Sequence, residues 1–590
     1  MALPTEFYYE QIKKNKKKLR KKSRVLSILS LVRGFVFFAT VYFTYYYFFN
    51  YQVSLLIAIS GIIIFIALVS LYSNTKYQES KLGALVEINE NELKTLNRDF
   101  AFRDPGGEFA DNDHDFSSDI DLFGNGSFFQ YLNRTVTNTG KGLLASMLLS
   151  NNIEGITDKQ EAVKELNDKP EWRQEFSATA FLVKPETSTN TILNWLLSYE
   201  PFLTHRMAFL PLIFSSISLI IIILTFLGYL NWLVIGTWFI LGLVVTGYYL
   251  KKTNRLSFFT SKMQSTFEQY YKLIKYIESE SFLSKPLKEG KANVFVGNNK
   301  ASKNIKSFSR AIDALDQRNN ILIALFGNAF FLWDLIQGYR IEKWIKTHQK
   351  EVKHWFDAIA FFDAYNSLGN FAFNHPEYVY PEIVDSDFIM KVENLGHPLI
   401  KIENVVCNDI QIEKEKFFII TGANMAGKST FLRTVSLHLL MANTGMPVCA
   451  TKSVYCPIKL ITSMRTSDSL INEESYFFSE LKRLKYIVEK MENSNYFVIL
   501  DEILKGTNSK DKAEGSKKFI ERLSTLTSTG IVATHDLSLC ALAEKNQKVE
   551  NYHFDAYIKN DELSFDYKLK KGICKNMNAS FLMKKMGIIN

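Results

Sequence analysis

Four long stretches without a charged residue constrain most what this chain can fold into. Residues 34–49 and 53–72 form a first pair separated by only three residues, and residues 207–228 and 233–250 form a second pair. An α-helix rises 1.5 Å per residue, so each stretch can cross or nearly cross a hydrocarbon layer about 30 Å thick. Because a helix satisfies its own backbone groups in lipid, each pair predicts a transmembrane helical hairpin.

Basic residues beside these stretches predict the orientation of the hairpins. Nine Lys and Arg and no acidic residue lie between residues 13 and 24, and Lys251, Lys252 and Arg255 follow the last stretch. The links within the pairs carry no Lys or Arg. The positive-inside rule therefore places the N-terminus, residues 73–206 and residues 251–590 in the cytosol. We expect an integral protein of the inner (cytoplasmic) membrane with four spans.

Two alternatives exist for the apolar stretches. A cleaved signal peptide would explain only the first, and it is disfavoured because no small-residue cleavage site follows and a second apolar stretch does. Each stretch could also be a helix buried in a protein core. Their length and pairing favour the membrane hairpins.

The charge balance argues against a basic protein that coats nucleic acid. The net charge is +9, from 70 Lys and Arg against 61 Asp and Glu, and the block at residues 13–24 accounts for all of it. In the rest of the chain, the basic and acidic residues are equal in number, so its net charge is zero. With 47% hydrophobic and 22% charged residues, the chain is not mainly disordered. Its five cysteines form no CxxC pair, so neither a disulfide framework nor a zinc site is expected.

The most specific motif is a glycine-rich run at residues 421–430, Thr-Gly-Ala-Asn-Met-Ala-Gly-Lys-Ser-Thr, which fits the P-loop pattern. It lies between a predicted buried strand, residues 416–421, and a predicted helix, residues 429–443. Such a loop directs backbone N–H groups at phosphate oxygens. Lys428 would neutralise the β- and γ-phosphates of ATP, and Ser429 would bind Mg²⁺. The predicted nucleotide-binding residues here are Gly422, Ala423, Asn424, Met425, Ala426, Gly427, Lys428, Ser429 and Thr430.

Two later strands end in residues suited to ATP hydrolysis. The strand at residues 496–500 is followed by Asp501 and Glu502, a Walker B arrangement in which Asp501 would hold Mg²⁺ and Glu502 would act as general base. The strand at residues 530–534 is followed by His535, which could reach the γ-phosphate. Taken separately, each is also compatible with an ordinary strand end or a surface histidine, and their order after a P-loop favours catalysis.

A polar segment, residues 467–480, lies between these motifs and leads into a helix. Its predicted core stripe is Phe477, Leu481, Leu484, Val488 and Met491. Ser475, near the start of the helix, would offer its hydroxyl and the helix dipole to a nucleotide.

In their order along the chain and in their amino-acid sequences, the motifs resemble those of the MutS family of mismatch-repair ATPases. The run at 421–430 is similar to the family's TGPNMGGKST, with Ala423 and Ala426 as departures, and residues 501–509 are similar to DEIGRGTST. Residues 533–535, 474–480 and 567–572 resemble the family's ATH, STFMxE and YxLxxG motifs. The histidine-proline pair at 397–398 and the asparagine-aspartate pair at 408–409 match positions ahead of the P-loop. The resemblance covers about residues 394–590.

A fainter resemblance extends into the helical part of the chain, at residues 121–127, 132–140 and 159–163. A returning lever helix is predicted from the apolar pattern Ile341, Ile345, Val352, Trp355, Ile359 and Phe362. The resemblance implies a dimer of ABC-type ATPase heads in which Ser475 of one subunit completes the site of the other. It also implies levers that enclose double-stranded DNA.

Mismatch recognition itself is not expected. Residues 7–10, Phe-Tyr-Tyr-Glu, give only a loose match to the family's Phe-x-Glu wedge, with two residues in place of one between Phe and Glu, and they directly precede a basic run and an apolar helix. We interpret the match as coincidence. The second hairpin also falls where the family's levers reach toward their DNA clamp.

The predicted fold is an α/β P-loop (ABC-type) ATPase domain preceded by a mostly α-helical core and lever domain, with two transmembrane helical hairpins. The expected parts are a basic cytosolic tail (1–24), the first hairpin (25–72), the two parts of the helical domain (73–206 and 251–385), the second hairpin (207–250) and the ATPase domain (386–590).

Three functions remain open from the sequence. The leading hypothesis is a membrane-anchored, homodimeric ATPase that uses ATP and Mg²⁺ and engages DNA through its levers. The alternative is an ATP-driven machine that remodels the membrane or moves an unidentified partner protein and has no DNA role. The third is a tethering scaffold that binds ATP but barely hydrolyses it, which the presence of Glu502 disfavours.

Overall fold

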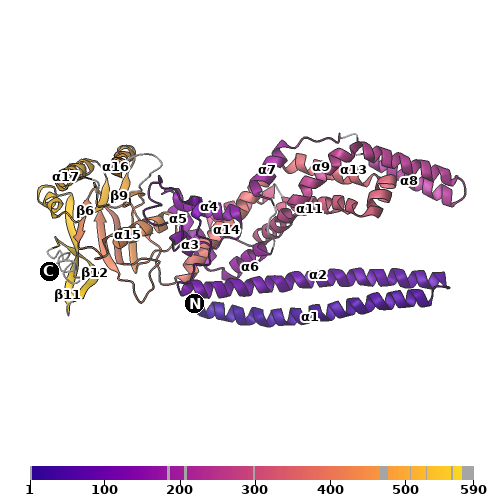
Figure 1. Ribbon diagram of the computed structural model, residues 1–590, viewed down its shortest axis with the longest axis horizontal. Coiled ribbons are helices and arrows are strands. Elements are labelled where there is room, and N and C mark those ends of the chain that lie inside the picture. Colours follow the sequence, from indigo (N-terminus) through magenta and orange to yellow (C-terminus); the bar gives the residue numbers. More distant parts are fainter. Residues whose placement is uncertain are drawn as a thin grey trace.

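The computed structural model is elongated, with the C-terminal β-sheets at one end of the long axis and the tips of two helical hairpins at the other (Figure 1). The structure describes residues 3–182, 187–204, 207, 209–296, 299–465, 476–504, 507–526, 528–559 and 562–574. A helical body joins the two ends. The predicted catalytic motifs therefore lie far from the tips of the long apolar helices.

Two antiparallel helices, α1 (Pro4–Tyr46) and α2 (Tyr51–Leu96), form the first hairpin. Both are much longer than the predicted spans because each continues as a helix toward the body. The basic residues between 13 and 24 belong to α1. The segment predicted as a basic tail is thus helical and continuous with the first apolar stretch. The Arg33 guanidinium lies 4.6 Å from the centre of the Tyr72 ring, so these two residues are level where the apolar part of the hairpin begins.

The first part of the helical body consists of short helices with polar caps. The side chains of Ser127, Thr137 and Ser188 accept hydrogen bonds from the first turns of three of these helices, which fixes where they begin. The helices are α3 (Phe128–Leu132), α4 (Asn138–Leu149), α5 (Ile156–Asn167), α6 (Pro170–Phe181) and α7 (Thr189–Ser198).

The second hairpin consists of α8 (Phe209–Phe226) and α9 (Trp232–Ser279). The Asn231 side chain accepts a hydrogen bond from the Leu233 amide and caps α9. Because α9 runs unbroken for 48 residues, its apolar stretch and its part in the body are one rigid element. Four described helices, α1, α2, α8 and α9, are long and apolar enough to cross a membrane.

The chain returns from the second hairpin through further helices and a two-stranded ribbon. These elements are α10 (Lys285–Ala292), β1 (Phe295–Val296), β2 (Asn299–Lys300), α11 (Ala301–Asp316), α12 (Asn328–Phe331), α13 (Trp333–His348) and α14 (Glu351–Asn374). A five-residue π-helix, Ile323–Gly327, precedes α12.

The predicted lever helix is two helices, α13 and α14, separated at residues 349–350. All six residues of the predicted apolar stripe are buried, so the stripe is confirmed, whereas a single continuous helix is wrong. At the break, His348 Nδ1 lies 2.6 Å from Glu351 Oε2, and the rings of Trp344, His348 and Trp355 form one cluster with centroids 5.2–6.1 Å apart. These large side chains keep the two helices together despite the interruption.

The C-terminal part contains a six-stranded sheet and a four-stranded sheet. In spatial order the first consists of β12 (Glu562–Lys571), β11 (Val549–Lys559), β6 (Phe417–Gly422), β10 (Thr529–Ala533), β9 (Tyr496–Asp501) and β8 (Lys459–Ser463). All neighbouring pairs are parallel except β11 with β12. The second consists of β3 (Glu382–Ile383), β7 (Lys452–Tyr455), β4 (Phe388–Leu395) and β5 (Asn408–Glu413).

The connections between the strands of the six-stranded sheet contain helices α15 (Lys428–Asn443), α16 (Tyr476–Asn493), α17 (Ser509–Thr525) and α18 (Leu542–Lys545). Every residue of β6 is buried, as expected for a parallel strand covered on both faces. The stripe predicted for α16 is only partly correct: Leu484, Val488 and Met491 are buried, but Leu481 is 39% exposed. A helical N-terminal part and an α/β C-terminal part are thus confirmed.

Candidate nucleotide-binding site

The predicted catalytic motifs meet at one edge of the six-stranded sheet because of the strand order. Strand β10 lies between β6 and β9 and pairs with both in parallel. The carboxyl ends of parallel strands share an edge. The glycine-rich loop after β6, the acidic pair after β9 and His535 after β10 are therefore neighbours.

The glycine-rich loop, residues 422–428, joins β6 to α15. Gly427 has φ of +99°, in the left-handed region, and a Cβ atom there would lie 3.0 Å from the Tyr567 ring. A side chain at this position would therefore be both strained and crowded. The free N–H groups at the start of α15 and its dipole face the loop, which suits this place for an anion. Asn424 and Met425 are exposed, whereas Ala423 and Ala426 are buried.

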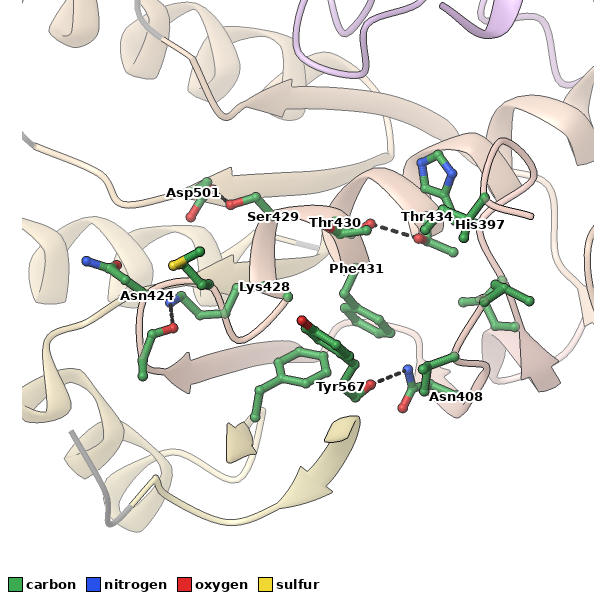
Figure 2. Close-up of a pocket in the computed structure, with 18 of the residues that line it drawn as sticks. His397, Asn408, Asn424, Lys428, Ser429, Thr430, Phe431, Thr434, Asp501 and Tyr567 are labelled. Carbon is green, nitrogen blue, oxygen red and sulfur yellow. Dashed lines mark hydrogen bonds between the residues drawn. The ribbon is translucent and has the colours of Figure 1, made fainter. Parts of the chain in front are cut away.

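Lys428 is folded back onto its own loop. Its ammonium group donates a hydrogen bond of 2.9 Å to the Gly422 carbonyl oxygen. It donates a second, of 3.1 Å, to the Ala423 carbonyl oxygen (Figure 2). Burial lowers the pKa of Lys428, while the nearby carboxylates of Asp501 and Glu502 oppose that shift. The ammonium group is thus held where phosphate oxygens would approach the loop.

Ser429 and Asp501 form the pair predicted to hold a metal ion. The Ser429 hydroxyl donates a 2.7 Å hydrogen bond to Asp501 Oδ2 (Figure 2). A hydroxyl and a carboxylate oxygen are the hard ligands that Mg²⁺ prefers, and Mg²⁺ sites use few protein ligands beside water and phosphate. The residues present therefore fit that ion.

Glu502 and His535 are in direct contact, with Glu502 Oε1 2.8 Å from His535 Nε2. The same nitrogen lies 3.2 Å from Lys428 Nζ. A protonated Nε2 donates to Glu502, and an unprotonated Nε2 accepts from Lys428, so the two contacts compete for one atom. Glu502 has φ of +51°, a left-handed conformation that non-glycine residues rarely adopt. The chain thus places this carboxylate at a backbone cost typical of functional positions.

A cavity of about 500 Å³ opens beside the glycine-rich loop. Its walls include residues that the sequence analysis did not assign to the site: Leu395, His397, Ile400, Val405, Asn408, Phe431, Phe554 and Tyr567. Figure 2 shows Phe431 and Tyr567 on one side of this cavity and His397 further along it. An apolar and aromatic wall next to an anion-binding loop suits a nucleobase attached to phosphates.

Asn408 fixes one side of this wall. Its side-chain amide donates to the Tyr567 carbonyl at 3.0 Å and accepts from the Leu569 amide at 2.8 Å, which ties β5 to β12. His397 is buried enough that its pKa is lowered to about 4, with Arg433 and Arg98 adding to the effect. His397 therefore carries no charge at neutral pH. The sequence motifs included positions 397, 408 and 567 but gave them no role in the site. The cavity shows that all three residues belong to its wall.

One further hydrogen bond links α16 to the turn that follows the acidic pair. Leu504 lies two residues after Glu502, and its amide donates a 2.5 Å hydrogen bond to Oε1 of Glu480, which is buried in α16. Leu504 also has a left-handed φ of +60°. Glu480 therefore supports the turn that carries Glu502. Ser475, predicted to act on a nucleotide in a partner subunit, lies outside the described residues.

Comparison with known proteins identifies the C-terminal region. The family described as MutS domain V matches residues 418–585. The chain is 32% identical over 213 residues to MutS protein homolog 4 of Homo sapiens, covering 34% of this chain and 22% of that protein. It is 32% identical over 240 residues to DNA mismatch repair protein MutS of Finegoldia magna, covering 39% of this chain and 28% of that protein.

A longer match reaches beyond the sheets. The chain is 28% identical over 339 residues to DNA mismatch repair protein MutS of Methanosarcina barkeri, covering 56% of this chain and 33% of that protein. This match is longer than residues 386–590, so it includes part of the helical body. The matched regions cover 22–33% of the length of these relatives.

Proposed function

Because this chain belongs to the MutS family, we propose that it is a membrane-anchored ATPase that binds and hydrolyses ATP in a dimer of its C-terminal heads. The observation that carries the proposal is the meeting of Lys428, the Ser429–Asp501 pair and the Glu502–His535 pair at one sheet edge. These are the groups that phosphoryl transfer to water requires.

Each residue has a role in this proposal. Backbone N–H groups of residues 422–430 and the Lys428 ammonium bind the phosphates, and the aromatic wall with Tyr567 receives the base. Ser429 and Asp501 hold Mg²⁺, which neutralises charge on the phosphate oxygens when bound. Glu502 takes a proton from the attacking water, and His535 holds the Glu502 carboxylate in place. Ser475 of the second subunit completes the site.

Membrane anchoring is proposed from α1, α2, α8 and α9. Only 6–22% of the residues in their most apolar windows are buried, so most of these side chains are at least partly exposed on the described protein. Such large exposed apolar surfaces are unusual on a protein surrounded by water. The tips of the two hairpins lie at the same end of the molecule, opposite the C-terminal sheets (Figure 1). One bilayer can therefore receive both hairpins, with the basic segment of α1 and the heads on its cytosolic side.

DNA is proposed as the polymer engaged by the helical body because relatives that match this chain are named DNA mismatch repair proteins. A second candidate function, movement of the membrane or of a partner protein without DNA, is favoured by α9. Since this one helix contains both an apolar stretch and part of the body, rotation of the body would move the hairpin with it.

The experiment uses the full chain reconstituted in anionic lipid vesicles, with hydrolysis measured with and without double-stranded DNA. Hydrolysis that depends on Mg²⁺ supports the ATPase. DNA binding that weakens steeply with salt, together with DNA-stimulated hydrolysis, supports the DNA role. Hydrolysis stimulated by lipid but insensitive to DNA supports the second function. Absence of hydrolysis in all conditions would contradict the proposal.

A further inference from the structure

A third apolar feature lies between α11 and α13, apart from the two hairpins. Residues 320–333, Asn-Ile-Leu-Ile-Ala-Leu-Phe-Gly-Asn-Ala-Phe-Phe-Leu-Trp, contain no charged residue. We call this segment the apolar loop. It comprises the π-helix Ile323–Gly327 and the short helix α12. At fourteen residues it is too short to span a bilayer, which takes about 20.

The apolar loop exposes its largest side chains. Ile321 is 79% exposed, Leu322 61% and Phe326 48%, and Leu325 and Phe331 exceed 40%. A protein surrounded by water rarely gathers so many large apolar side chains on one short segment. The exposed groups therefore need a covering that the described part of the chain does not supply.

Contacts with α9 place the apolar loop beside the second hairpin. The Phe239 ring lies 5.9 Å from that of Phe326 and 5.6 Å from that of Phe330. Gly242 packs directly on the backbone of Ala329, where a Cβ atom would lie 2.0 Å from the carbonyl oxygen. Phe239 and Gly242 are near the middle of the apolar stretch at residues 233–250. The loop therefore reaches the depth of that stretch.

A contact with α8 gives the same position. The Ser215 hydroxyl donates a hydrogen bond of 3.4 Å to the Phe331 carbonyl oxygen. Ser215 lies within the predicted span at residues 207–228. Both helices of the second hairpin thus contact the apolar loop within their apolar stretches.

Polar groups close the base of the apolar loop. Arg318, just before it, and Asp334, just after it, form an ion pair of 3.1 Å in which Asp334 is buried. The Trp333 indole donates to the Ala314 carbonyl at 2.7 Å. The chain thus leaves and rejoins the body at one place, with α11 and α13 on the same side of the loop.

Backbone groups within the apolar loop are paired locally. The Ala324 amide donates to the Asn320 carbonyl at 2.8 Å. The Asn328 side chain donates to the Ala324 carbonyl at 3.0 Å and accepts from the Asp334 amide at 2.9 Å. A segment at membrane depth must satisfy its backbone within the protein, and helical turns with an asparagine cap do so here.

We propose that residues 320–333 form a re-entrant element that inserts into the cytosolic leaflet of the bilayer beside α8 and α9. Lipid hydrocarbon covers Ile321, Leu322, Leu325 and Phe326, and the Arg318–Asp334 pair lies at the boundary with the cytosol. Lipid is the occupant because the exposed side chains continue the exposed apolar surface of the second hairpin, including Leu212 and Leu241. This inference rests on the proposed membrane anchoring of that hairpin.

The test places a fluorescent non-canonical amino acid at single positions of the full chain reconstituted in phosphatidylcholine–phosphatidylglycerol vesicles. The positions are Leu325 in the apolar loop, Leu241 in α9 as the membrane reference and Leu283, 79% exposed between α9 and α10, as the cytosolic reference. Each sample is quenched separately by nitroxide-labelled lipid and by aqueous iodide. We expect the Leu325 probe to lose most of its fluorescence to nitroxide lipid, as the Leu241 probe does, and to resist iodide.

The results separate this inference from the anchoring of the hairpin. If lipid quenches the probe at 241 while iodide quenches the probe at 325, the re-entrant element is overturned and the hairpin anchor stands. If neither quencher reaches 325 while lipid reaches 241, protein covers the loop, as in an interface with a second copy, and the inference is also overturned. If lipid quenches neither 241 nor 325, the membrane anchor itself fails.

Discussion

The hydroxyl of Tyr8 in α1 donates a 2.6 Å hydrogen bond to Asn374 Oδ1 in the last turn of α14. Tyr8 is fully buried, and the neighbouring Phe7 packs edge-on against Phe373 at 5.1 Å. Because α14 leads directly to β3 and β4, this contact fixes the first hairpin to the base of the C-terminal α/β part, the proposed ATPase head. Movement of the head would therefore be transmitted to α1 through α14.

Substitution of Tyr8 should loosen this attachment. Tyr8→Phe keeps the ring but leaves Asn374 Oδ1 without its donor, which costs about 1–3 kcal/mol. Tyr8→Ala also removes the ring and should cost about 3–5 kcal/mol. Thermal unfolding in detergent and the rate of trypsin cleavage between residues 13 and 24 measure the effect. Tyr9→Phe, at an exposed position on the same helix, is the control. If Tyr8→Ala left the unfolding temperature and the cleavage rate unchanged, the contact would not stabilise the attachment of α1 to α14.

Glu92, near the end of α2, gives the second attachment. Its carboxylate pairs with Arg103 at 2.8 Å and Arg134 at 3.0 Å and accepts hydrogen bonds from Asn370 and Asn374. Burial alone would raise the pKa of Glu92, but the two arginines hold it well below its ordinary value. The Glu92 carboxylate is therefore ionised near neutral pH and balances the charge of the two arginines.

Removal of this carboxylate leaves two largely buried guanidinium groups unpaired, so Glu92→Ala should destabilise the protein by about 3–5 kcal/mol. Glu90→Ala is a matched control on the same helix. Glu90 forms a 2.7 Å pair with Lys16 in which both side chains are about half exposed, and its loss should cost at most about 1 kcal/mol. Chemical denaturation midpoints compare the two. Equal shifts would mean that the buried pair adds nothing specific.

Local patterns explain how much of this molecule could be predicted from its sequence. The apolar stretches, the buried strand β6 and the stripe on α13 and α14 depend on hydrophobicity at short range, and each has the structure expected. The Glu92 cluster could not be predicted, because its partners come from α2, two loops and α14. The helical state of residues 13–24 could not be predicted either, because this basic segment has no apolar stripe of its own.

The candidate site shows the same division. Residues such as Lys428, Asp501 and His535 follow strands within short motifs, so the sequence indicated them, and parallel pairing brings them together. The wall containing His397, Asn408 and Tyr567 comes from separate segments that only the fold assembles. The apolar loop at residues 320–333 is shorter than a membrane span and so gives no signal in the sequence, and only its contacts with α8 and α9 place it beside the second hairpin.

Acid should destabilise the protein through His438, which is buried within α15. Its Nε2 lies 3.1 Å from Ser453 Oγ, and burial lowers its pKa to about 3. The unfolded chain takes up this proton below about pH 6.5, whereas the folded chain does not until about pH 3. Between these values the unfolded state binds more protons, so stability falls as pH falls, by about 1.4 kcal/mol per pH unit for this one group.

His438→Gln retains a polar group near Ser453 and removes the titration. The variant should lose less stability than the wild-type chain between pH 6.5 and 4, measured by unfolding midpoints across that range. Both proteins keep His397, whose lowered pKa acts in the same direction, so the difference isolates His438. His354→Gln, at an exposed position on α14, should leave the profile unchanged. Parallel profiles for wild type and His438→Gln would refute the assignment.

Ser429→Ala should raise the Mg²⁺ concentration needed for hydrolysis. The variant loses the hydroxyl that contacts Asp501 at 2.7 Å and would donate an oxygen to the ion. We expect the half-saturating Mg²⁺ concentration to rise about 10- to 100-fold, with nucleotide binding in the absence of Mg²⁺ little changed. Titration of hydrolysis with Mg²⁺ measures this, and Ser538→Ala at an exposed position is the control. An unchanged Mg²⁺ requirement would remove Ser429 from the metal site.

Glu502→Gln distinguishes a motor from a scaffold. The amide has nearly the shape of the carboxylate but cannot take a proton from water, so turnover should fall about 10²- to 10⁴-fold while ATP still binds. With hydrolysis blocked, two heads that close on ATP should stay closed, and the variant should remain dimeric with nucleotide bound. Turnover, retained nucleotide and mass by light scattering are measured together, with Glu544→Gln at an exposed position as the control. Turnover equal to that of the wild type would reject Glu502 as the base. A wild-type chain that also retains ATP indefinitely would instead make the head a nucleotide-dependent tether, because a base that is never used cannot drive movement through α14 and α9.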